Sequence, residues 1–198
     1  MNRIRIGTRG SNLALIQARK TKDTLQAAFP DLEISIDVIS TKGDRNTTVP
    51  LHKVQATGVF VKELEQALVA NRIDLAVHSL KDMPSQLPDG LAITAVLERD
   101  DPRDALLRPN GEPKVNLTMR ETVGTSSLRR KAQLLRMYPG ITVVDIRGNI
   151  ETRLSKLDNG LCDATILASC GMDRAGYAGR IAHRFSESEM LPAACQGI

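Results

Sequence analysis

The strongest constraint on the fold is a pair of sequence patterns that occur once in each half of the chain. Ile6–Ser11 and Val123–Ser127 both read as the end of an apolar strand, a Gly-Thr pair and a serine that opens a helix. Residues 74–79 and 163–169 both place an aspartate before an apolar strand and a serine after it. This weak internal sequence similarity predicts two α/β lobes that face each other across a cleft, each presenting a helix N-terminus to it.

Composition limits the classes of protein to which the chain can belong. Its 198 residues suffice for one large domain or two small ones, and 41% hydrophobic with 25% charged residues is ordinary for a soluble globular protein. Aromatic residues make up 3% and Trp is absent, which disfavours binding by base stacking. No apolar run approaches the ~20 residues that cross a bilayer, and the N-terminus lacks the apolar core of a signal peptide, so we expect no membrane partner.

Cysteine usage indicates a reducing compartment. The chain has three cysteines, Cys162, Cys170 and Cys195, an odd number without metal-ligand spacing. We therefore expect reduced thiols, a cytoplasmic location and no metal site.

Hydrophobic periodicity predicts alternating strands and helices. We expect strands at residues 3–7, 34–38, 73–77, 91–97, 122–124, 141–146 and 163–168, and helices after Ser11, around Leu64, after Ser127, from Ile150 and from Ser169. Residues 40–56 read as a long polar loop, a type that is often functional or mobile. A charged break at 98–104 divides the chain into a first lobe at 1–98, joined by a return segment at 190–198, and a second lobe at 99–189.

The stretch Ile73–Pro84 changes abruptly from an apolar strand to polar side chains. His78, Ser79, Lys81 and Asp82 follow that strand within five positions. Groups at the carboxyl end of a strand in an open α/β sheet point into the ligand crevice. A lysine and an aspartate there are suited to bind an anion and move a proton; the alternative is a surface salt bridge on a turn.

A second set of candidate site residues consists of arginines at strand ends and helix starts: Arg9, Arg129, Arg130, Arg147 and Arg153. Cations in the first turn of a helix oppose its dipole, which makes sense if an anion lies nearby. Guanidinium groups bind carboxylates through two parallel hydrogen bonds, so the set predicts a polycarboxylate ligand. The alternative spreads these arginines over solvated helix faces.

Four motifs give the chain a resemblance to a known family. They are VHSLKDMP at 77–84, GTSSLRR at 124–130, RGN at 147–149 and TRLSKL at 152–157. Together with residues 60–65 and 98–105, they run in order through nearly the whole chain and resemble the porphobilinogen deaminases, also called hydroxymethylbilane synthases.

The resemblance implies an enzyme of tetrapyrrole (haem) biosynthesis. Members of this family join four porphobilinogen molecules head to tail, release ammonia each time and build the product on a covalently attached dipyrromethane cofactor. The implied fold is α/β, with two periplasmic-binding-protein-like (type II) lobes, a cleft between them and a third, smaller domain.

The resemblance also implies roles for individual residues. Asp82 is the implied catalytic carboxylate, which stabilises the azafulvene cation left by ammonia and moves protons. Lys53 matches a family lysine on a mobile lid. The residues implied to hold acetate and propionate groups are Arg9, Ser11, Lys53, Ser79, Lys81, Thr125, Ser126, Arg129, Arg130, Arg147, Arg153 and Arg174.

The sequence departs from the family pattern in several places. The third domain, with the cysteine that carries dipyrromethane, lies outside these 198 residues. We therefore expect a fragment, a natural truncation or one part of a split enzyme, without sustained turnover alone and with a separate third-domain chain as a candidate partner. Ala56-Thr57-Gly58 replaces a Gly-Lys-Gly and removes one loop cation.

The cysteines and histidines have plainer interpretations. Cys195 stands where the family usually has glycine; a substitute attachment point is one interpretation, and a small buried apolar residue is the favoured one. We expect Cys162 and Cys170 to be packing residues, and His52 and His78 to be hydrogen-bonded structural residues rather than ligands.

Two functions from other classes stay open beside the enzyme. The missing cofactor cysteine motivates a non-catalytic polycarboxylate-binding module built on the same two lobes. A pI of about 9.1 motivates nucleic-acid binding, which predicts steeply salt-dependent affinity. The net charge of only +4 is modest, and we expect no nucleic-acid partner.

Overall fold

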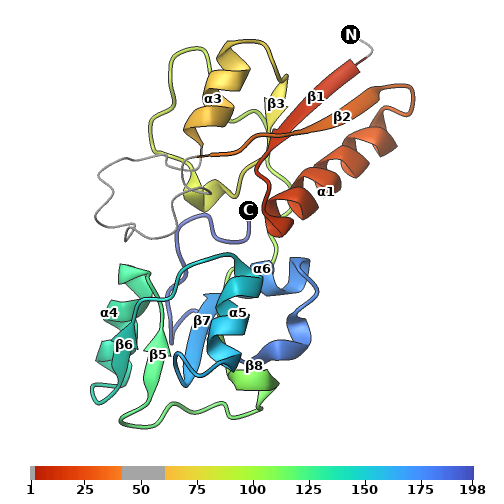
Figure 1. Ribbon diagram of the computed structural model, residues 1–198. Coiled ribbons are helices and arrows are strands. Elements are labelled where there is room, and N and C mark those ends of the chain that lie inside the picture. The colour runs from red at the N-terminus through yellow and green to blue at the C-terminus, as the bar shows by residue number, and fades with distance from the viewer. Residues whose placement is uncertain (1–2, 42–60) are drawn as a thin grey trace. The chain divides into compact units, whose positions relative to one another are not determined.

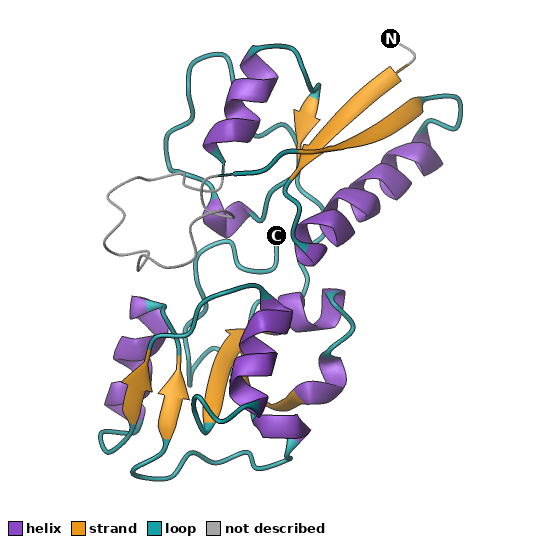
Figure 2. Cartoon of the chain, viewed as in Figure 1, coloured by secondary structure: helices purple, strands orange, loops and turns teal. Residues whose placement is uncertain are grey.

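The chain divides into two compact units, Met1–Glu98 with Ile198, and Arg99–Gly197. The structure is a computed structural model that describes residues 3–41 and 61–198. Each unit has its own β-sheet with helices beside it, drawn orange and purple in Figure 2. The expected return of 190–198 to the first unit is limited to Ile198, because the side chain of Gln196 donates to the Pro102 carbonyl and to Asp104 inside the second unit.

The described part of the first unit is a parallel three-stranded sheet in the order β2-β1-β3. Its elements are β1 (Arg3–Thr8), α1 (Asn12–Ala28), β2 (Glu33–Val38), α3 (Lys62–Val69), β3 (Leu75–Ala76) and the 3₁₀ turn η2 (Leu80–Asp82). Helices α1 and α3 pack against this sheet through separate apolar clusters, one containing Ala18 and Ile6, the other Leu64 and Ile73 (Figure 1). The sheet is therefore covered by apolar contacts of two helices, as expected for an α/β unit.

Two local features explain the start of this unit. The Ser11 hydroxyl accepts a hydrogen bond from the Ala14 N–H at 3.3 Å, so it is the predicted N-cap of α1. Gly7 lies so close to Ile73 that an added Cβ would be 2.2 Å from its Cδ1. Only glycine lets β1 and the residues before β3 approach this closely.

The second unit contains a mixed five-stranded sheet in the order β6-β5-β7-β4-β8. Its elements are β4 (Asp104–Leu107), η3 (Pro109–Gly111), β5 (Thr122–Gly124), α4 (Leu128–Met137), β6 (Thr142–Val144), α5 (Ile150–Asp158), β7 (Ala164–Ala168), α6 (Ser169–Arg174), η4 (Ala178–Arg180) and β8 (Ile181–Arg184). Strands β5, β6 and β7 are parallel, whereas β4 runs antiparallel to both β7 and β8.

The core of this unit consists of two apolar clusters, one on each face of the sheet, because successive side chains of a strand point to opposite faces. Leu106 and Ile166 pack with Leu134 of α4, whereas Leu107 and Leu167 pack with Leu154 of α5. Successive strand residues point to opposite faces, so β4 and β7 are apolar on both. The apolar run of β7 was predicted as a strand, whereas β4 was not among the predicted strands.

Most predicted elements are present, with boundaries that differ by a few residues. Gly160, with φ of +79°, follows the C-cap residue Asn159 of α5, a position at which glycine is common. The predicted strand at 91–97 is wrong: this segment is in no strand, and Ile93 and Val96 are at least half exposed. A strand needs a hydrogen-bonded neighbour, which apolar composition cannot supply. From residue 42 onward, the predicted polar loop lies outside the described residues.

The described residues contain neither a helix that could span a membrane nor a group of side chains that could hold a metal ion. None of the helices at 3–41 and 61–198 is long and apolar enough to span a bilayer. In the same part of the chain, no group of His, Cys, Asp and Glu side chains could hold a metal ion.

Candidate functional site

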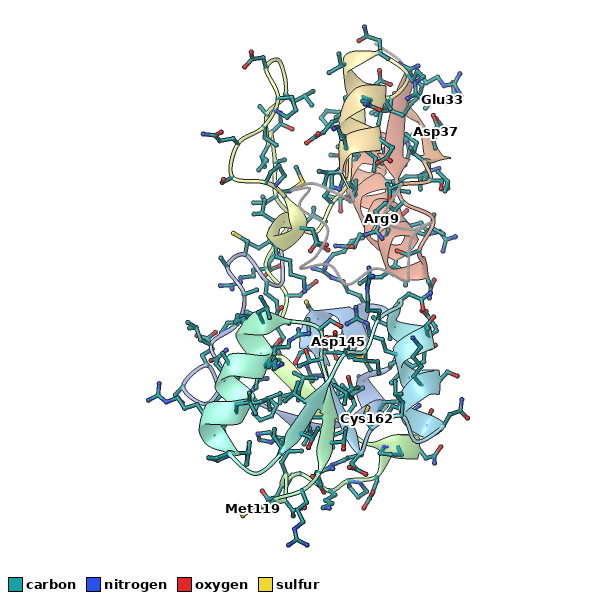
Figure 3. The ribbon with its side chains drawn as sticks, turned by 60° about the vertical axis from the view of Figure 1, so that its left-hand side comes forward. Arg9, Glu33, Asp37, Met119, Asp145 and Cys162 are labelled. Carbon is teal, nitrogen blue, oxygen red and sulfur yellow. The ribbon has the colours of Figure 1, made fainter. Side chains whose placement is uncertain are left out.

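The carboxyl edge of the first sheet carries several of the predicted residues. Its strands are parallel, and β1 pairs with β3 through Gly7 and Ala76, so the residues that follow them emerge at one edge. Arg9, labelled in Figure 3, follows β1, and His78 and Ser79 follow β3. Arg9, His78 and Ser79 therefore follow strands that end at the same edge of this sheet.

The polar side chains at this edge hold one another in place. Gln17 of α1 donates to the Ser79 hydroxyl at 3.0 Å, and that hydroxyl lies 3.3 Å from the Gln17 carbonyl oxygen. Burial and the charge of Arg9 lower the pKa of His78 to about 4, so its imidazole is neutral at pH 7. The hydrogen bond expected for this ring is not formed with any residue at 3–41 or 61–198.

Asp82 is the last residue of η2 and its side chain is exposed. Its backbone N–H donates to the Ser79 carbonyl at 2.9 Å, which ties it to the strand end. Among the described residues, none makes a hydrogen bond or ion pair with its carboxylate. Lys81 beside it is also exposed, and Lys53 lies outside the described residues. The Asp82 carboxylate is therefore exposed at the same sheet edge as Ser79.

The corresponding edge of the second sheet is where three parallel strands end and an antiparallel strand begins. Thr125 and Ser126 follow β5, Arg147 follows β6, and Asp104 at the start of β4 faces Ala168 at the end of β7. Residues from four strands therefore meet at this edge.

Thr125 and Ser126 brace the turn that leads into α4. The Thr125 hydroxyl accepts from the Ser127 N–H at 3.2 Å, and the Ser126 hydroxyl donates to the Ile146 carbonyl at 3.0 Å. The Ser127 hydroxyl, in turn, accepts from the Arg130 N–H and caps the helix. These contacts fix the first turn of α4, which carries two of the predicted arginines.

Three arginines come together beside this turn, although they belong to three segments of the chain. Arg130 is on α4, Arg147 follows β6, and Arg153 is on α5, where its Nε donates to the Gly148 carbonyl at 2.8 Å. Burial, together with the positive charges of Arg130 and Arg147, lowers the pKa of Arg153 to about 10. Guanidinium groups held this close repel one another, so a bound anion would stabilise the cluster.

The sequence analysis missed one charged residue at this edge, Asp104. It is fully buried, and its carboxylate lies 2.7 Å from Arg129, 2.7 Å from Arg130 and 2.8 Å from the Gln196 amide. Burial raises the pKa of Asp104, but Arg130, Gln196 and Arg129 together lower it below its usual value. An aspartate that opens an apolar strand was the available signal, since a buried charge requires partners.

The contacts of Arg174 and the exposure of Cys195 differ from what the sequence led us to expect. The Arg174 guanidinium donates to Asp100 and to the Gly197 carbonyl, both at 2.7 Å, so it links two segments of the second unit. The expectation that Cys195 is buried is wrong, because its side chain is exposed. Its φ of +60° lies in the left-handed region, which favours glycine. Cys162 and Cys170 are buried, as predicted.

The chain also resembles solved structures in fold. The probable amino-acid ABC transporter extracellular-binding protein ytmK from Bacillus subtilis matches 90% of this chain and 75% of its own, with a TM-score of 0.53 and 13% identity. A putative lipoprotein from Ruminococcus gnavus matches 94% of this chain and 79% of its own, with a TM-score of 0.51 and 10% identity. At such low identity the likeness concerns the fold alone, and it agrees with the predicted periplasmic-binding-protein-like α/β class.

Sequence comparisons give a more specific result. A profile described as "Porphobilinogen deaminase, dipyromethane cofactor binding domain" matches residues 4–198. The porphobilinogen deaminase of Chromobacterium violaceum is 50% identical over 197 residues, which cover the whole of this chain and 64% of that protein. The enzyme of Syntrophobacter fumaroxidans is 48% identical over 98% of this chain and 63% of its own length. The chain, which spans less than two thirds of the length of these relatives, therefore belongs to the porphobilinogen deaminase family.

Proposed function

We propose that the chain provides the substrate-binding and reacting groups of a hydroxymethylbilane synthase, which joins four porphobilinogen molecules head to tail with release of ammonia. The observation that carries this proposal is that Arg130, Arg147 and Arg153, from three segments of the chain, bring positive charges to one edge of the sheet; burial, and then the charges of Arg130 and Arg147, lower the pKa of Arg153 to about 10. Porphobilinogen bears an acetate and a propionate group, so each unit added to the growing product brings two more carboxylates. A cluster of cations matches such a ligand in charge.

The arginines would bind these carboxylates through paired hydrogen bonds. Arg129 is a quarter exposed, and one Nη of its guanidinium already contacts Asp104. We assign carboxylate binding to the cationic and hydroxyl side chains at the two sheet edges, namely Arg9, Ser11, Ser79, Lys81, Thr125, Ser126, Arg129, Arg130, Arg147 and Arg153. The sequence resemblance alone adds Lys53, which lies outside the described residues. Arg174 belongs to the same proposed set, although Asp100 and the Gly197 carbonyl already accept hydrogen bonds from its guanidinium.

Asp82 would act on the reacting pyrrole. The C–N bond of the aminomethyl group breaks as ammonia leaves, a C–C bond forms to the next pyrrole, and one ring proton is released. A carboxylate beside the pyrrole N–H stabilises the cation formed when ammonia leaves and takes up the released proton. The exposed carboxylate of Asp82 is free to do both.

The residues of the second unit fit a dipyrromethane group, which carries four carboxylates. Arg130 is buried, yet its Nε lacks a hydrogen-bond partner among the described residues, so that the cluster retains an unsatisfied donor. Arg129, Arg147 and Arg153 would hold the carboxylates of the group. When bound, dipyrromethane supplies the terminal pyrrole onto which porphobilinogen is added. We place the reaction in the cytoplasm, since the cysteines are unpaired.

Asp82→Asn tests the catalytic role. In a chimera that completes this chain with the remaining third of the Chromobacterium violaceum enzyme, we expect porphobilinogen consumption to fall at least about 100-fold. The Kd for porphobilinogen, measured by calorimetry, should change less than about threefold, because the amide keeps the shape of the acid.

Asp89→Asn is the matched control, since Asp89 is another exposed aspartate of the first unit. Retention of most of the activity by Asp82→Asn would refute the assigned role. A chimera that binds porphobilinogen but never consumes it would instead support a non-catalytic polycarboxylate-binding module.

A further inference from the structure

The buried aspartate at the start of β4 has no part in the reaction proposed above. Asp104 is 0% exposed; its Oδ1 accepts two hydrogen bonds, whereas its Oδ2 is in an ion pair and accepts no hydrogen bond from the described residues. Its Oδ1 receives Arg130 Nη2 at 2.7 Å and Gln196 Nε2 at 2.8 Å, and its Oδ2 lies 2.7 Å from Arg129 Nη2. Removing an ion from water is costly, so a buried carboxylate depends on the charges of its neighbours, here Arg129 and Arg130.

The orientation of β4 brings this carboxylate to the arginines. Because β4 is antiparallel to β7, its first residue lies at the edge where the parallel strands end. The first turn of α4 begins at that edge with Arg129 and Arg130, whose charges oppose the helix dipole. Asp104 therefore supplies the anion that these two residues require, from inside the protein.

The contacts leave one of the two arginines accessible. Arg130 also donates to the Ile166 carbonyl and its side chain is 9% exposed, whereas that of Arg129 is 25% exposed. Arg129 donates through Nη1 to the Leu191 carbonyl and meets Asp104 through Nη2. A long flexible side chain is thus held at two points while part of its guanidinium still reaches solvent. Fixing an arginine in advance reduces the entropy lost when it binds a ligand.

We propose that Asp104 is a positioning residue for carboxylate binding: it fixes the guanidinium groups of Arg129 and Arg130 before the substrate arrives. The inference rests on the proposed function, because it concerns the binding of the same polycarboxylate. Asp104 does not touch the substrate; it acts through Arg129, in the way that outer groups orient the ligands of a metal site.

A double-mutant cycle on porphobilinogen binding tests this role in the purified chain. We expect Asp104→Asn and Arg129→Ala each to raise the Kd about tenfold. The double variant should bind no more weakly than Arg129→Ala alone, because the first change acts through the residue removed by the second. A structural role alone would lower the melting temperature and give losses in affinity that multiply.

The matched control is Asp101→Asn. Asp101 also binds two arginines of the second unit, Arg103 and Arg184, but contacts neither Arg129 nor Arg130. This variant loses comparable ion pairs and should bind porphobilinogen like the unaltered chain.

Two further measurements keep the inference testable if Asp104→Asn does not fold. Gln196→Leu removes one donor to Asp104 and should raise the Kd about threefold, again only while Arg129 is present. NMR relaxation of the Arg129 Nε–H group should show a rigid guanidinium in the unaltered chain and a mobile one in Gln196→Leu.

The outcomes separate the two proposals. A rigid Arg129 in a chain that binds no porphobilinogen would overturn the proposed function, and with it the substrate role of Asp104. Two results would overturn this inference alone, provided that the unaltered chain binds porphobilinogen. One is that the losses of affinity in Asp104→Asn and Arg129→Ala multiply in the double variant; the other is that Arg129 is as mobile in the unaltered chain as in Gln196→Leu.

Discussion

At the scale of single residues, the charged groups of this chain differ in how their charges are compensated. Asp104 and Arg130 are buried and paired with each other, which leaves little net charge in the interior. Arg153 instead lies near the positive charges of Arg130 and Arg147, and burial together with these charges lowers its pKa. Asp104 thus compensates the charge of Arg130 from inside the protein, whereas a bound carboxylate would compensate that of Arg153.

The lowered pKa of His78 predicts that the stability of the chain depends on pH. Its pKa of about 4 lies below the value of about 6.5 in the unfolded chain, so the unfolded state binds more protons between these values. The stability that neutral His78 contributes is complete above pH 6.5 and is lost as the pH falls toward 4. Between pH 7 and pH 5, we expect the free energy of unfolding to drop on the order of 1 kcal/mol more in the unaltered chain than in His78→Gln.

Urea unfolding at the two pH values measures this difference. His183→Gln is the control, because that ring lies in the second unit, 3.7 Å from Glu189. A pH dependence that is identical in His78→Gln and in the unaltered chain would show that burial and Arg9 do not act on His78 as described.

At the scale of elements, the turn between β6 and α5 determines where two of the clustered arginines lie. Asn149 caps α5 by accepting from the Thr152 N–H at 2.8 Å, and Gly148 before it has φ of +119°. A Cβ on Gly148 would lie 2.6 Å from the Thr152 side chain. Arg147 and Arg153 flank this turn, so its backbone conformation sets the spacing of their side chains.

Gly148→Ala should therefore harm both stability and binding. We expect it to lower the free energy of unfolding by about 2 kcal/mol or more, because the strain of positive φ adds to a steric clash. Gly160→Ala is the control: its φ is also positive, but nothing lies within 4 Å of the added Cβ, so about 1 kcal/mol is expected.

Chemical denaturation measures the two losses, and calorimetry measures porphobilinogen binding at a temperature where both variants are folded. Only Gly148→Ala should bind more weakly. Equal losses of stability in the two variants would mean that the contact with Thr152 relaxes freely.

At the scale of the whole molecule, the two units have separate cores and sheets. The second unit is one continuous stretch with apolar clusters on both faces of its sheet, and its ends are joined by hydrogen bonds such as that from the Asp100 N–H to the Gly197 carbonyl at 3.0 Å. A stretch with its own core and nearby ends has the features of an autonomous domain.

We therefore expect residues 99–197, expressed alone, to unfold in one cooperative thermal transition. Leu134→Ala, which empties a fully buried position, should lower the free energy of unfolding of this stretch by about 2–5 kcal/mol. Leu135→Ala, at an exposed position of the same helix, should change it by less than about 1 kcal/mol. Differential scanning calorimetry provides the measurement, and a broad transition without a heat-capacity peak would contradict the expectation.

Local sequence patterns were sufficient to predict many of the secondary-structure elements and candidate site residues of this protein. The apolar runs of β1, β5 and β7, the serine caps and the polar groups after each strand depend on interactions within a few residues, so Asp82 and the arginines could be identified from their neighbours alone. Pairing and burial are non-local, since their free energies depend on segments far apart in the chain. For that reason the antiparallel direction of β4, the burial of Asp104 beneath two arginines, the crowding around Arg153 and the absence of a strand at 91–97 became known only from the folded chain.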